Sequence, residues 1–387
     1  MYMFEVSERE RDLPEVVIGK LLKIASESKD IISLGPGEPD FKTPKPIIDY
    51  AKKILDKGTH YAPPQGRLDL REALAQKLKK ENKIKISPEN IVVTTGSQEA
   101  LFSALLSTID PGDQVLIPNP GYLGYIPTIE LLNGAPIHVK LEEEENFELN
   151  PDKIKEAIDK KKTKVLIINS PSNPTGTVLS RSVLEEIADI AVEHNLLIFS
   201  DEAYEKIVYD QEHISPASLN GMQDYVLTFQ TFSKTYAMCG FRLGYVAAPK
   251  KFAEAIDKTH HYITICAPHL SQLIARKALE LPRKYIDSMV KEYDRRRKLI
   301  VQRLNEIGLR TKAPHGAFYT FSNISHISNN SLKFADRLLK EAKVAVVPGT
   351  EFGKFGEGFI RCSYATDYKL IEKAMDKIEG FLKKKQN

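Results

Sequence analysis

The chain has 387 residues, of which 42% are hydrophobic and 28% charged, so it is long and apolar enough for two or three globular domains. Its 55 basic and 52 acidic residues give a net charge of +3, which excludes proteins that bind nucleic acid through overall charge. No apolar run approaches the ~20 residues that span a bilayer. The N-terminus lacks an apolar signal segment and the three cysteines form no paired motif, so we expect a cytoplasmic protein without a disulfide framework or a metal site.

The middle of the chain alternates strand-like and helix-like segments. We expect strands over 91–95, 114–118, 137–141, 165–169, 196–201, 225–230 and 244–248. Helices are expected over 97–109, up to residue 132 and over 181–193. Runs that are apolar at nearly every position indicate strands buried on both faces. The pattern therefore predicts an α/β fold in which a mostly parallel sheet lies between layers of helices.

The sequence changes character near Pro282. A long helix is expected over 283–307, followed by short strands near 317–321, 343–347 and 359–363 and a final helix from residue 368. This pattern predicts a smaller α+β domain. We expect an N-terminal arm and part of the small domain in residues 1–44, a large domain in 45–281 and the small C-terminal domain in 282–387. The charge runs at 142–145, 160–162 and 295–297 are expected to lie on solvated surface.

Several ligand-binding motifs are absent from the sequence. No GxGxxG follows a strand, and there is no GxxxxGK[ST], HExxH or GxSxG. In open α/β sheets, ligands bind beyond the carboxyl ends of the strands. The polar residues at these ends are therefore the candidates for a site.

Gly96, Ser97 and Gln98 follow the first strand and open a helix. Free N–H groups and the positive end of the helix dipole make such a turn an anion site, although a plain helix cap would look the same. The turn-rich segment 170–176 follows the fourth strand and could simply be a linker.

Asp201 ends the next strand, and Tyr204 lies three residues further on. A carboxylate at the end of a buried strand is costly unless a cation or a strong donor pairs with it. A helix cap is the simpler alternative for Asp201.

Lys234 follows the strand 225–230 together with Thr231 and Ser233, and Arg242 lies eight residues on. Neighbouring positive charge favours the neutral amine, which is the nucleophilic form of lysine. These residues and those above provide an anion cup, an amine, a carboxylate and a phenol. That set suits pyridoxal 5'-phosphate (PLP), with phosphate in the cup, the aldehyde on the amine and the ring nitrogen on the carboxylate.

The motifs SPSNPTG (170–176), SDEAY (200–204) and TFSKTYAMCGFRLGY (231–245) resemble those of class I/II aminotransferases of the aspartate aminotransferase type. SLGPGEPD, HYAPPQG, TTGSQEA, PNPGYLGY, GAFY and FIRCSYA match in the same order, so the resemblance covers nearly the whole chain. It implies a PLP-dependent transferase of fold type I with a seven-stranded, mostly parallel sheet, and it implies that PLP binds in the domain 45–281.

The resemblance also implies roles for single residues. Lys234 would bind the cofactor aldehyde and move protons, Asp201 would keep the ring nitrogen protonated, and Tyr204 and Asn173 would donate to the ring's phenolate oxygen. Tyr122 would stack on the ring. The phosphate would be bound by Gly96, Ser97, Gln98, Thr231, Ser233 and Arg242.

For the substrate, the resemblance implies that Arg361 pairs with the α-carboxylate and that Gly35 and Asn173 complete the pocket. Tyr61 would reach the phosphate of the other subunit's cofactor, which implies a homodimer with shared active sites. Cys239 departs from the family pattern, and we expect it to have a packing role.

The expected activity is ping-pong transamination between an amino acid and a 2-oxo acid, with 2-oxoglutarate as the common acceptor. Aspartate, aromatic amino acids and 2-aminoadipate all remain open as donors, with Lys20 and Arg67 as candidates to bind a distal carboxylate. A C–S β-lyase or a cyclopropane-forming synthase would share nearly every cofactor residue. A cofactor-sensing transcription regulator is less favoured, because the first family motif begins at Ser33 and leaves no room for a DNA-binding domain before it.

Overall fold

The computed structural model describes residues 5–11, 13, 19, 28 and 30–384. Its largest element is a seven-stranded sheet with the order β2–β8–β7–β6–β5–β3–β4. Only β8 runs antiparallel to its neighbours, so the sheet is mostly parallel, as the sequence predicts. The strands are β2 (Ile91–Thr94), β3 (Gln114–Asn119), β4 (Ala135–Lys140), β5 (Thr163–Asn169), β6 (Leu197–Asp201), β7 (Val226–Thr231) and β8 (Gly244–Ala247).

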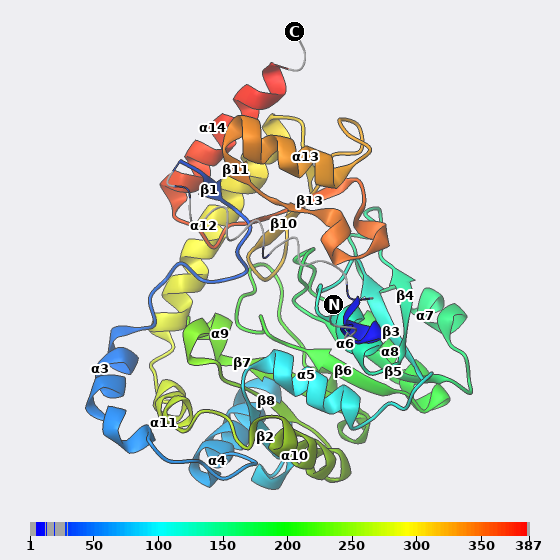
Figure 1. Ribbon diagram of the computed structural model, residues 1–387, viewed down its shortest axis with the longest axis vertical. Helices are drawn as coiled ribbons and strands as arrows, with labels where there is room; N and C mark the ends of the chain where they lie inside the picture. The colour runs from blue at the N-terminus through cyan, green and yellow to red at the C-terminus, as the bar shows by residue number, and fades with distance from the viewer. Residues whose placement is uncertain (1–4, 12, 14–18, 20–27, 29, 385–387) are drawn as a thin grey trace.

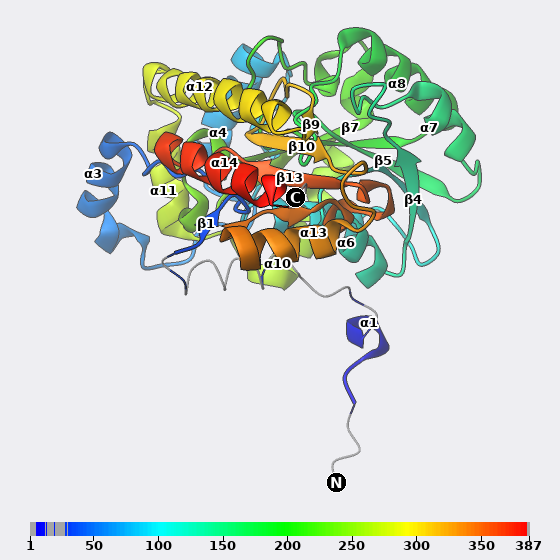
Figure 2. The same ribbon diagram turned by 90° about the horizontal axis from the view of Figure 1, so that it is seen from above.

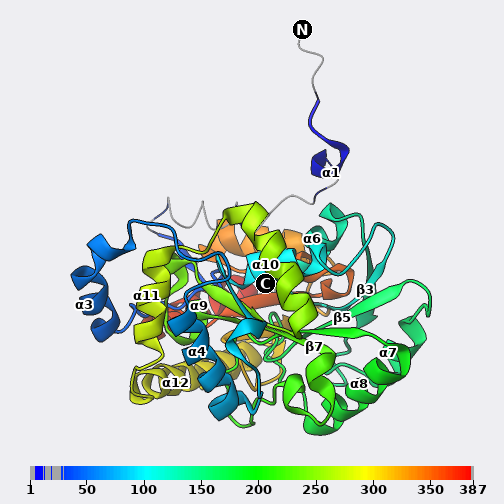
Figure 3. The same ribbon diagram turned by 90° about the horizontal axis from the view of Figure 1, so that it is seen from below.

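Helices cover both faces of this sheet, as Figure 3 shows with α6 and α10 on one side and α4 and α8 on the other. The strands pack in both directions because successive side chains point to opposite faces: Val92 belongs to one apolar cluster, and Ile91 and Val93 belong to another. The helices are α3 (Lys45–Lys53), α4 (Leu68–Lys77), α5 (Ser97–Leu106), α6 (Tyr125–Leu131), α7 (Pro151–Ala157), α8 (Arg181–His194), α9 (Phe232–Thr235), α10 (Lys250–Thr264) and α11 (His269–Ala278).

The C-terminal part forms a second layer above one end of the sheet (Figure 1). Its four-stranded antiparallel sheet has the order β12–β13–β10–β9, and a short parallel pair joins β1 to β11. Helices α12 and α14 pack side by side on it (Figure 2). The bounds are β1 (Ile32–Ser33), α12 (Lys284–Glu306), β9 (Arg310–Thr311), β10 (Tyr319–Asn323), α13 (Ser331–Arg337), β11 (Val344–Ala345), β12 (Val347–Pro348), β13 (Phe359–Ser363) and α14 (Tyr368–Lys383). We keep the division at residues 44/45 and 281/282 as a proposal.

The charge run 295–297 does not lie wholly on solvated surface, contrary to the sequence prediction. Arg296 and Arg297 are 4% and 5% exposed. Arg296 Nη1 donates to Asp40 Oδ1 at 2.8 Å, and Arg297 Nη1 donates to Asp210 Oδ2 at 2.7 Å. The partners lie far away in the sequence, so the run itself gave no sign of them. Within the part of the chain that the structure describes, no helix is long and apolar enough to cross a membrane.

Candidate active site

A cavity of about 310 Å³ lies beyond the carboxyl ends of the central strands, between the large sheet and the C-terminal layer. Every sequence-predicted site residue except Tyr61 lines it. These residues are Gly35, Gly96, Ser97, Gln98, Tyr122, Asn173, Asp201, Tyr204, Thr231, Ser233, Lys234, Arg242 and Arg361. Tyr61 is 78% exposed and lies outside this lining. Among the lining residues that the sequence analysis did not single out are Gly37, Phe229 and Tyr319.

One end of the cavity is an anion cup at the start of α5. Gly96 precedes this helix with φ of +85°, a conformation that glycine adopts without strain. A Cβ atom at this position would lie 2.7 Å from Arg242 Nη2. The missing side chain therefore leaves room for the guanidinium beside the free N–H groups of the helix start.

Thr231 and Ser233 complete the cup from the β7–α9 turn. Thr231 Oγ1 accepts from the backbone N–H of Ser233 at 3.2 Å, which caps the short helix. Gln98 contributes less of its side chain, because its Oε1 accepts from the Tyr122 hydroxyl at 3.0 Å.

Lys234 lies at the centre of the cavity wall. Its Nζ donates to the Gly37 carbonyl oxygen at 2.5 Å. Desolvation lowers the pKa of Lys234 below its usual value, and the charges of Arg242 and Arg361 act in the same direction. The environment thus favours a neutral amine, the form that attacks an aldehyde.

Asp201 ends β6 and points into the same cavity. Its Oδ2 accepts from the Tyr125 hydroxyl at 2.7 Å, and its Oδ1 accepts from the Ala203 backbone N–H at 3.2 Å. Desolvation raises the pKa of Asp201, although both hydrogen bonds oppose this effect. A protonated ring nitrogen would give this carboxylate the charged partner that it lacks.

Tyr125 was missed by the sequence analysis although it lies in the motif PNPGYLGY. It follows Tyr122 by three residues, and the two rings pack edge to face at 5.4 Å. Desolvation raises the pKa of Tyr122 to about 12, so its hydroxyl keeps its proton at neutral pH. The spacing of the two tyrosines was the available signal, since residues three apart share a helix face.

Tyr204 contacts a further tyrosine that closes the cavity. Its hydroxyl lies 2.7 Å from the hydroxyl of Tyr319. Desolvation raises the pKa of Tyr204 well above its usual value. The phenol therefore stays a hydrogen-bond donor.

Arg361 lies on β13 at the opposite side of the cavity and is 1% exposed. Its Nη1 donates to Asn173 Oδ1 at 3.0 Å, its Nη2 donates to the Gly35 carbonyl oxygen, and its buried Nε has no partner. Its guanidinium lies 4.4 Å from the centroid of the Tyr319 ring. These contacts fix the orientation of the guanidinium and leave donors free for a carboxylate.

The two candidates for a distal carboxylate do not line the cavity. Arg67 pairs with Asp69 at 3.0 Å and contacts His269 at 3.1 Å, and Lys20 lies outside the described residues. Cys239 Sγ donates to the Ser233 carbonyl oxygen at 3.2 Å. Desolvation raises the pKa of Cys239, which disfavours the thiolate and agrees with a packing role.

The residues fit PLP chemically. The cup offers backbone and side-chain donors for a phosphate, Lys234 offers an amine for the aldehyde, and Asp201 offers a carboxylate for the ring nitrogen. The space beside Gly96, which any side chain would fill, belongs to this cup.

Comparisons with known proteins agree with this chemistry. The family "Aminotransferase class I and II" matches residues 29–378. An aspartate aminotransferase of Pyrococcus abyssi is 50% identical over 374 residues, which are 95% of this chain and 96% of that protein. Aromatic-amino-acid aminotransferase 2 of Thermococcus litoralis is 46% identical over the same shares. The crystal structure of an aromatic aminotransferase from Pyrococcus horikoshii OT3 has a TM-score of 0.90 at 49% identity and covers 95% of this chain and 99% of that one. The chain therefore belongs to the class I and II aminotransferases, which are PLP-dependent transaminases of fold type I.

Proposed function

We propose that the residues around the cavity divide the work of transamination as follows. The cofactor supplies an electrophilic aldehyde and a ring that withdraws electrons from the substrate's α-carbon. Lys234 binds that aldehyde and then carries the proton between the α-carbon and the cofactor. Asp201 holds the proton on the ring nitrogen. Tyr204 and Asn173 donate to the ring's phenolate oxygen, and the ring of Tyr122 stacks on the cofactor.

The phosphate is held by Gly96, Ser97, Gln98, Thr231, Ser233 and Arg242. Arg361 binds the α-carboxylate, with Gly35 and Asn173 beside it. The observation that carries this proposal is the arrangement of Lys234 between the anion cup and Arg361 in a single cavity. A substrate held by its carboxylate at Arg361 would bring its α-carbon to the lysine amine.

The proposed donors are acidic or aromatic amino acids, including aspartate and 2-aminoadipate, and the proposed acceptor is 2-oxoglutarate. The two relatives named above carry the names of aspartate and aromatic aminotransferases. Within the described part of the cavity lining, the three cations are Lys234, Arg242 and Arg361, and each has one of the tasks above. A distal carboxylate would therefore need a cation from another segment, and Arg67 of a second subunit is our candidate.

We also propose a homodimer in which Tyr61 reaches the cofactor phosphate of the partner. Tyr61 and Tyr262 are 78% and 82% exposed, which is unusual for aromatic side chains and suits an interface. Helix α1 (Glu8–Arg11) has no buried residue and projects from the body of the chain (Figures 2 and 3), as an arm along a second subunit would. The three free cysteines suit the cytoplasm.

A donor panel tests the proposed function. Aspartate, phenylalanine, 2-aminoadipate and cystathionine are each incubated with 2-oxoglutarate, and kcat/KM is measured from glutamate formation. Transamination yields glutamate and the matching 2-oxo acid, whereas a C–S β-lyase yields a thiol, ammonia and pyruvate from cystathionine without any acceptor.

Borohydride reduction tests the lysine. It should fix the cofactor to a peptide that contains Lys234, and Lys234→Ala should lose the visible absorption band. Label on another lysine would refute the assignment.

A further inference from the structure

A buried polar cluster lies behind the candidate active site. We call it the rear cluster, and its members are Lys77, Asn82, Glu202, Glu205, His213, Ser215, Gln230 and Tyr245. Three of them are sequence neighbours of site residues: Glu202 of Asp201, Glu205 of Tyr204, and Gln230 of Thr231. Successive residues of a strand point to opposite faces, so the strands that carry the site carry the rear cluster on their other side. The roles proposed above use no member of this cluster.

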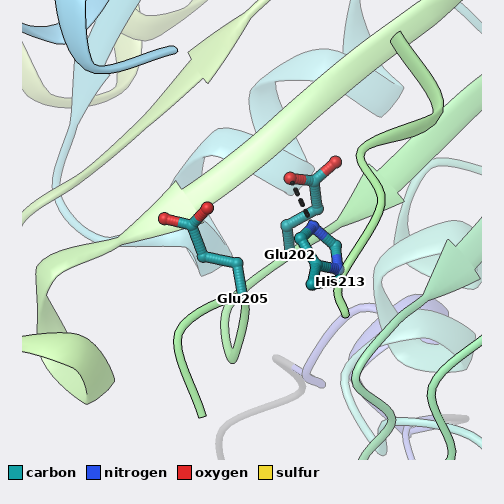
Figure 4. Close-up of side chains that lie close together, drawn as sticks. All are labelled: Glu202, Glu205 and His213. Carbon is teal, nitrogen blue, oxygen red and sulfur yellow. Dashed lines mark hydrogen bonds and ion pairs between the residues drawn. The ribbon is translucent and has the colours of Figure 1, made fainter. Parts of the chain in front are cut away.

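Glu202 is 1% exposed and is held by neutral donors. Its Oε2 accepts from Ser215 Oγ at 2.7 Å, from Gln230 Nε2 at 3.0 Å and from His213 Nε2 at 3.1 Å. Its Oε1 accepts from Ser200 Oγ at 3.0 Å. Figure 4 shows the ring of His213 against the Glu202 carboxylate, with Glu205 beside them.

Glu205, by contrast, has a cation of its own. Lys77 Nζ donates to Glu205 Oε1, to Gln230 Oε1 at 2.5 Å and to Asn82 Oδ1 at 2.9 Å. Burial opposes the charge of Glu205, but the attraction of Lys77 prevails and lowers the pKa of Glu205 to about 2. This ion pair is the cation and anion of the rear cluster, so its charges cancel.

His213 adds no positive charge beside Glu202. A carboxylate oxygen only accepts, so His213 Nε2 carries the hydrogen. Its Nδ1 is buried without a partner, and a second hydrogen there would be a buried, unpaired donor. The remaining cation nearby, Lys206, lies 3.9 Å from Glu205 Oε2 and is held at 2.7 Å by Glu81. Among the residues that the structure describes, no cation contacts the Glu202 carboxylate.

The uncompensated charge of Glu202 acts on Asp201. It raises the pKa of Asp201 in the same direction as desolvation does. Lys234, in the cavity on the other side, acts in the opposite direction, as do the hydrogen bonds from Tyr125 and Ala203. A carboxylate that holds protons more tightly is also a stronger acceptor for the N–H of a pyridinium ring.

We propose that Glu202 is a positioning residue whose buried negative charge, held by Ser215, Gln230 and His213, strengthens the hold of Asp201 on the proton of the bound ring nitrogen. The inference rests on the role proposed above for Asp201. It assigns the rear cluster a task in the reaction besides joining α4 to the sheet.

The experiment measures the proton itself. The apoenzyme is loaded with PLP labelled with ¹⁵N in the ring, and the ¹⁵N chemical shift is followed as the pH is raised. In Glu202→Gln, the amide keeps the shape of the carboxylate and can still accept from its partners, but the charge is lost. We expect the ring nitrogen of this variant to hold its proton roughly tenfold less tightly than in the parent, which lowers the titration midpoint by about one pH unit.

Two further variants separate charge from packing. Lys77→Met/Glu205→Gln removes the neighbouring ion pair without changing the net charge, so thermal stability should fall while the midpoint stays within about threefold of the parent. Glu202→Asp keeps the charge and should also keep the midpoint, and this arm remains informative if Glu202→Gln does not fold. A tenfold shift in either control, or a parent-like midpoint in Glu202→Gln, would overturn the inference.

Asp201→Asn makes a failure of this inference distinct from a failure of the proposed role of Asp201. The ring nitrogen should be unprotonated at neutral pH in that variant. Retained protonation there would overturn the role of Asp201. Lost protonation there, together with a parent-like midpoint in Glu202→Gln, would overturn the role of Glu202 alone.

Discussion

Replacing Arg361 by lysine tests how the site recognises its substrates. A guanidinium has five N–H groups. In the described structure, one is donated to Asn173 Oδ1, one to the Gly35 carbonyl oxygen, and the buried Nε has no partner. The remaining N–H groups can form a bidentate pair with a carboxylate, because the flat side chain is held over the ring of Tyr319 at 4.4 Å. Lysine cannot reproduce this planar fork.

The expected loss follows from the burial of Arg361, which is 1% exposed. Breaking a desolvated, hydrogen-bonded charge pair costs ~2–5 kcal/mol. That corresponds to a fall in kcat/KM of roughly 30-fold to several thousand-fold. The assay compares aspartate, phenylalanine and 2-aminoadipate, each with 2-oxoglutarate. All three should lose by the same factor within a few-fold, because each has the same α-carboxylate.

Cofactor affinity and a second arginine provide the controls. PLP binding should hardly change in Arg361→Lys, because the anion cup lies at the other end of the cavity. Arg297→Lys alters another buried arginine, 5% exposed and paired with Asp210, and should lower stability without changing substrate selectivity. If only aspartate and 2-aminoadipate suffer in Arg361→Lys, Arg361 binds the side-chain carboxylate and the proposed pocket is reversed.

Two more perturbations follow from the anion cup and the lysine. Gly96→Ala should lower PLP affinity at least tenfold, because the strained φ of +85° costs ~1–3 kcal/mol and the new methyl lies 2.7 Å from Arg242 Nη2; Gly112→Ala, with φ of +88° and open space, should lower stability alone, as equilibrium dialysis and urea unfolding will show. In the apoenzyme, desolvation lowers the pKa of Lys234 below its unfolded value near 10.5, so the folded chain holds fewer protons between the two values and its stability rises with pH there. Lys234→Met should therefore stabilise the apoenzyme by about 1 kcal/mol at pH 7, with a gain that shrinks towards pH 10; a constant gain would contradict the desolvation argument.

The strands of the large sheet could be predicted from sequence because their pattern is local. The expected strand 165–169 corresponds to Thr163–Asn169, and 225–230 corresponds to Val226–Thr231. The order of the strands is not local. Nothing in the run 244–248 shows that β8 inserts antiparallel between β2 and β7. Pairing depends on contacts between distant segments, so the sequence pattern predicted the layers but not the order.

The candidate site follows the same rule. The residues that lie next to strand ends were found, including Asp201 and Lys234. The partners that reach them from other segments were not. Tyr125 donates to Asp201 from α6, and Lys77 reaches Glu205 across 128 positions of sequence. A family resemblance compensates for this limit only at residues that carry a motif.

The segment 35–37 shows why such distant contacts matter for function. The Gly35 carbonyl oxygen accepts from Arg361, and the Gly37 carbonyl oxygen accepts from Lys234. The same Nζ atom of Lys234 cannot hold Gly37 and bind an aldehyde with unchanged geometry, so cofactor binding exchanges a contact instead of adding one. The net gain is the difference between the two interactions, which is smaller than either. Asp40, three residues after Gly37, is tied to the buried Arg296 of α12 at 2.8 Å. The carbonyl that Lys234 must release is thus anchored to the C-terminal layer, and this links the state of the lysine to the layer that carries Arg361.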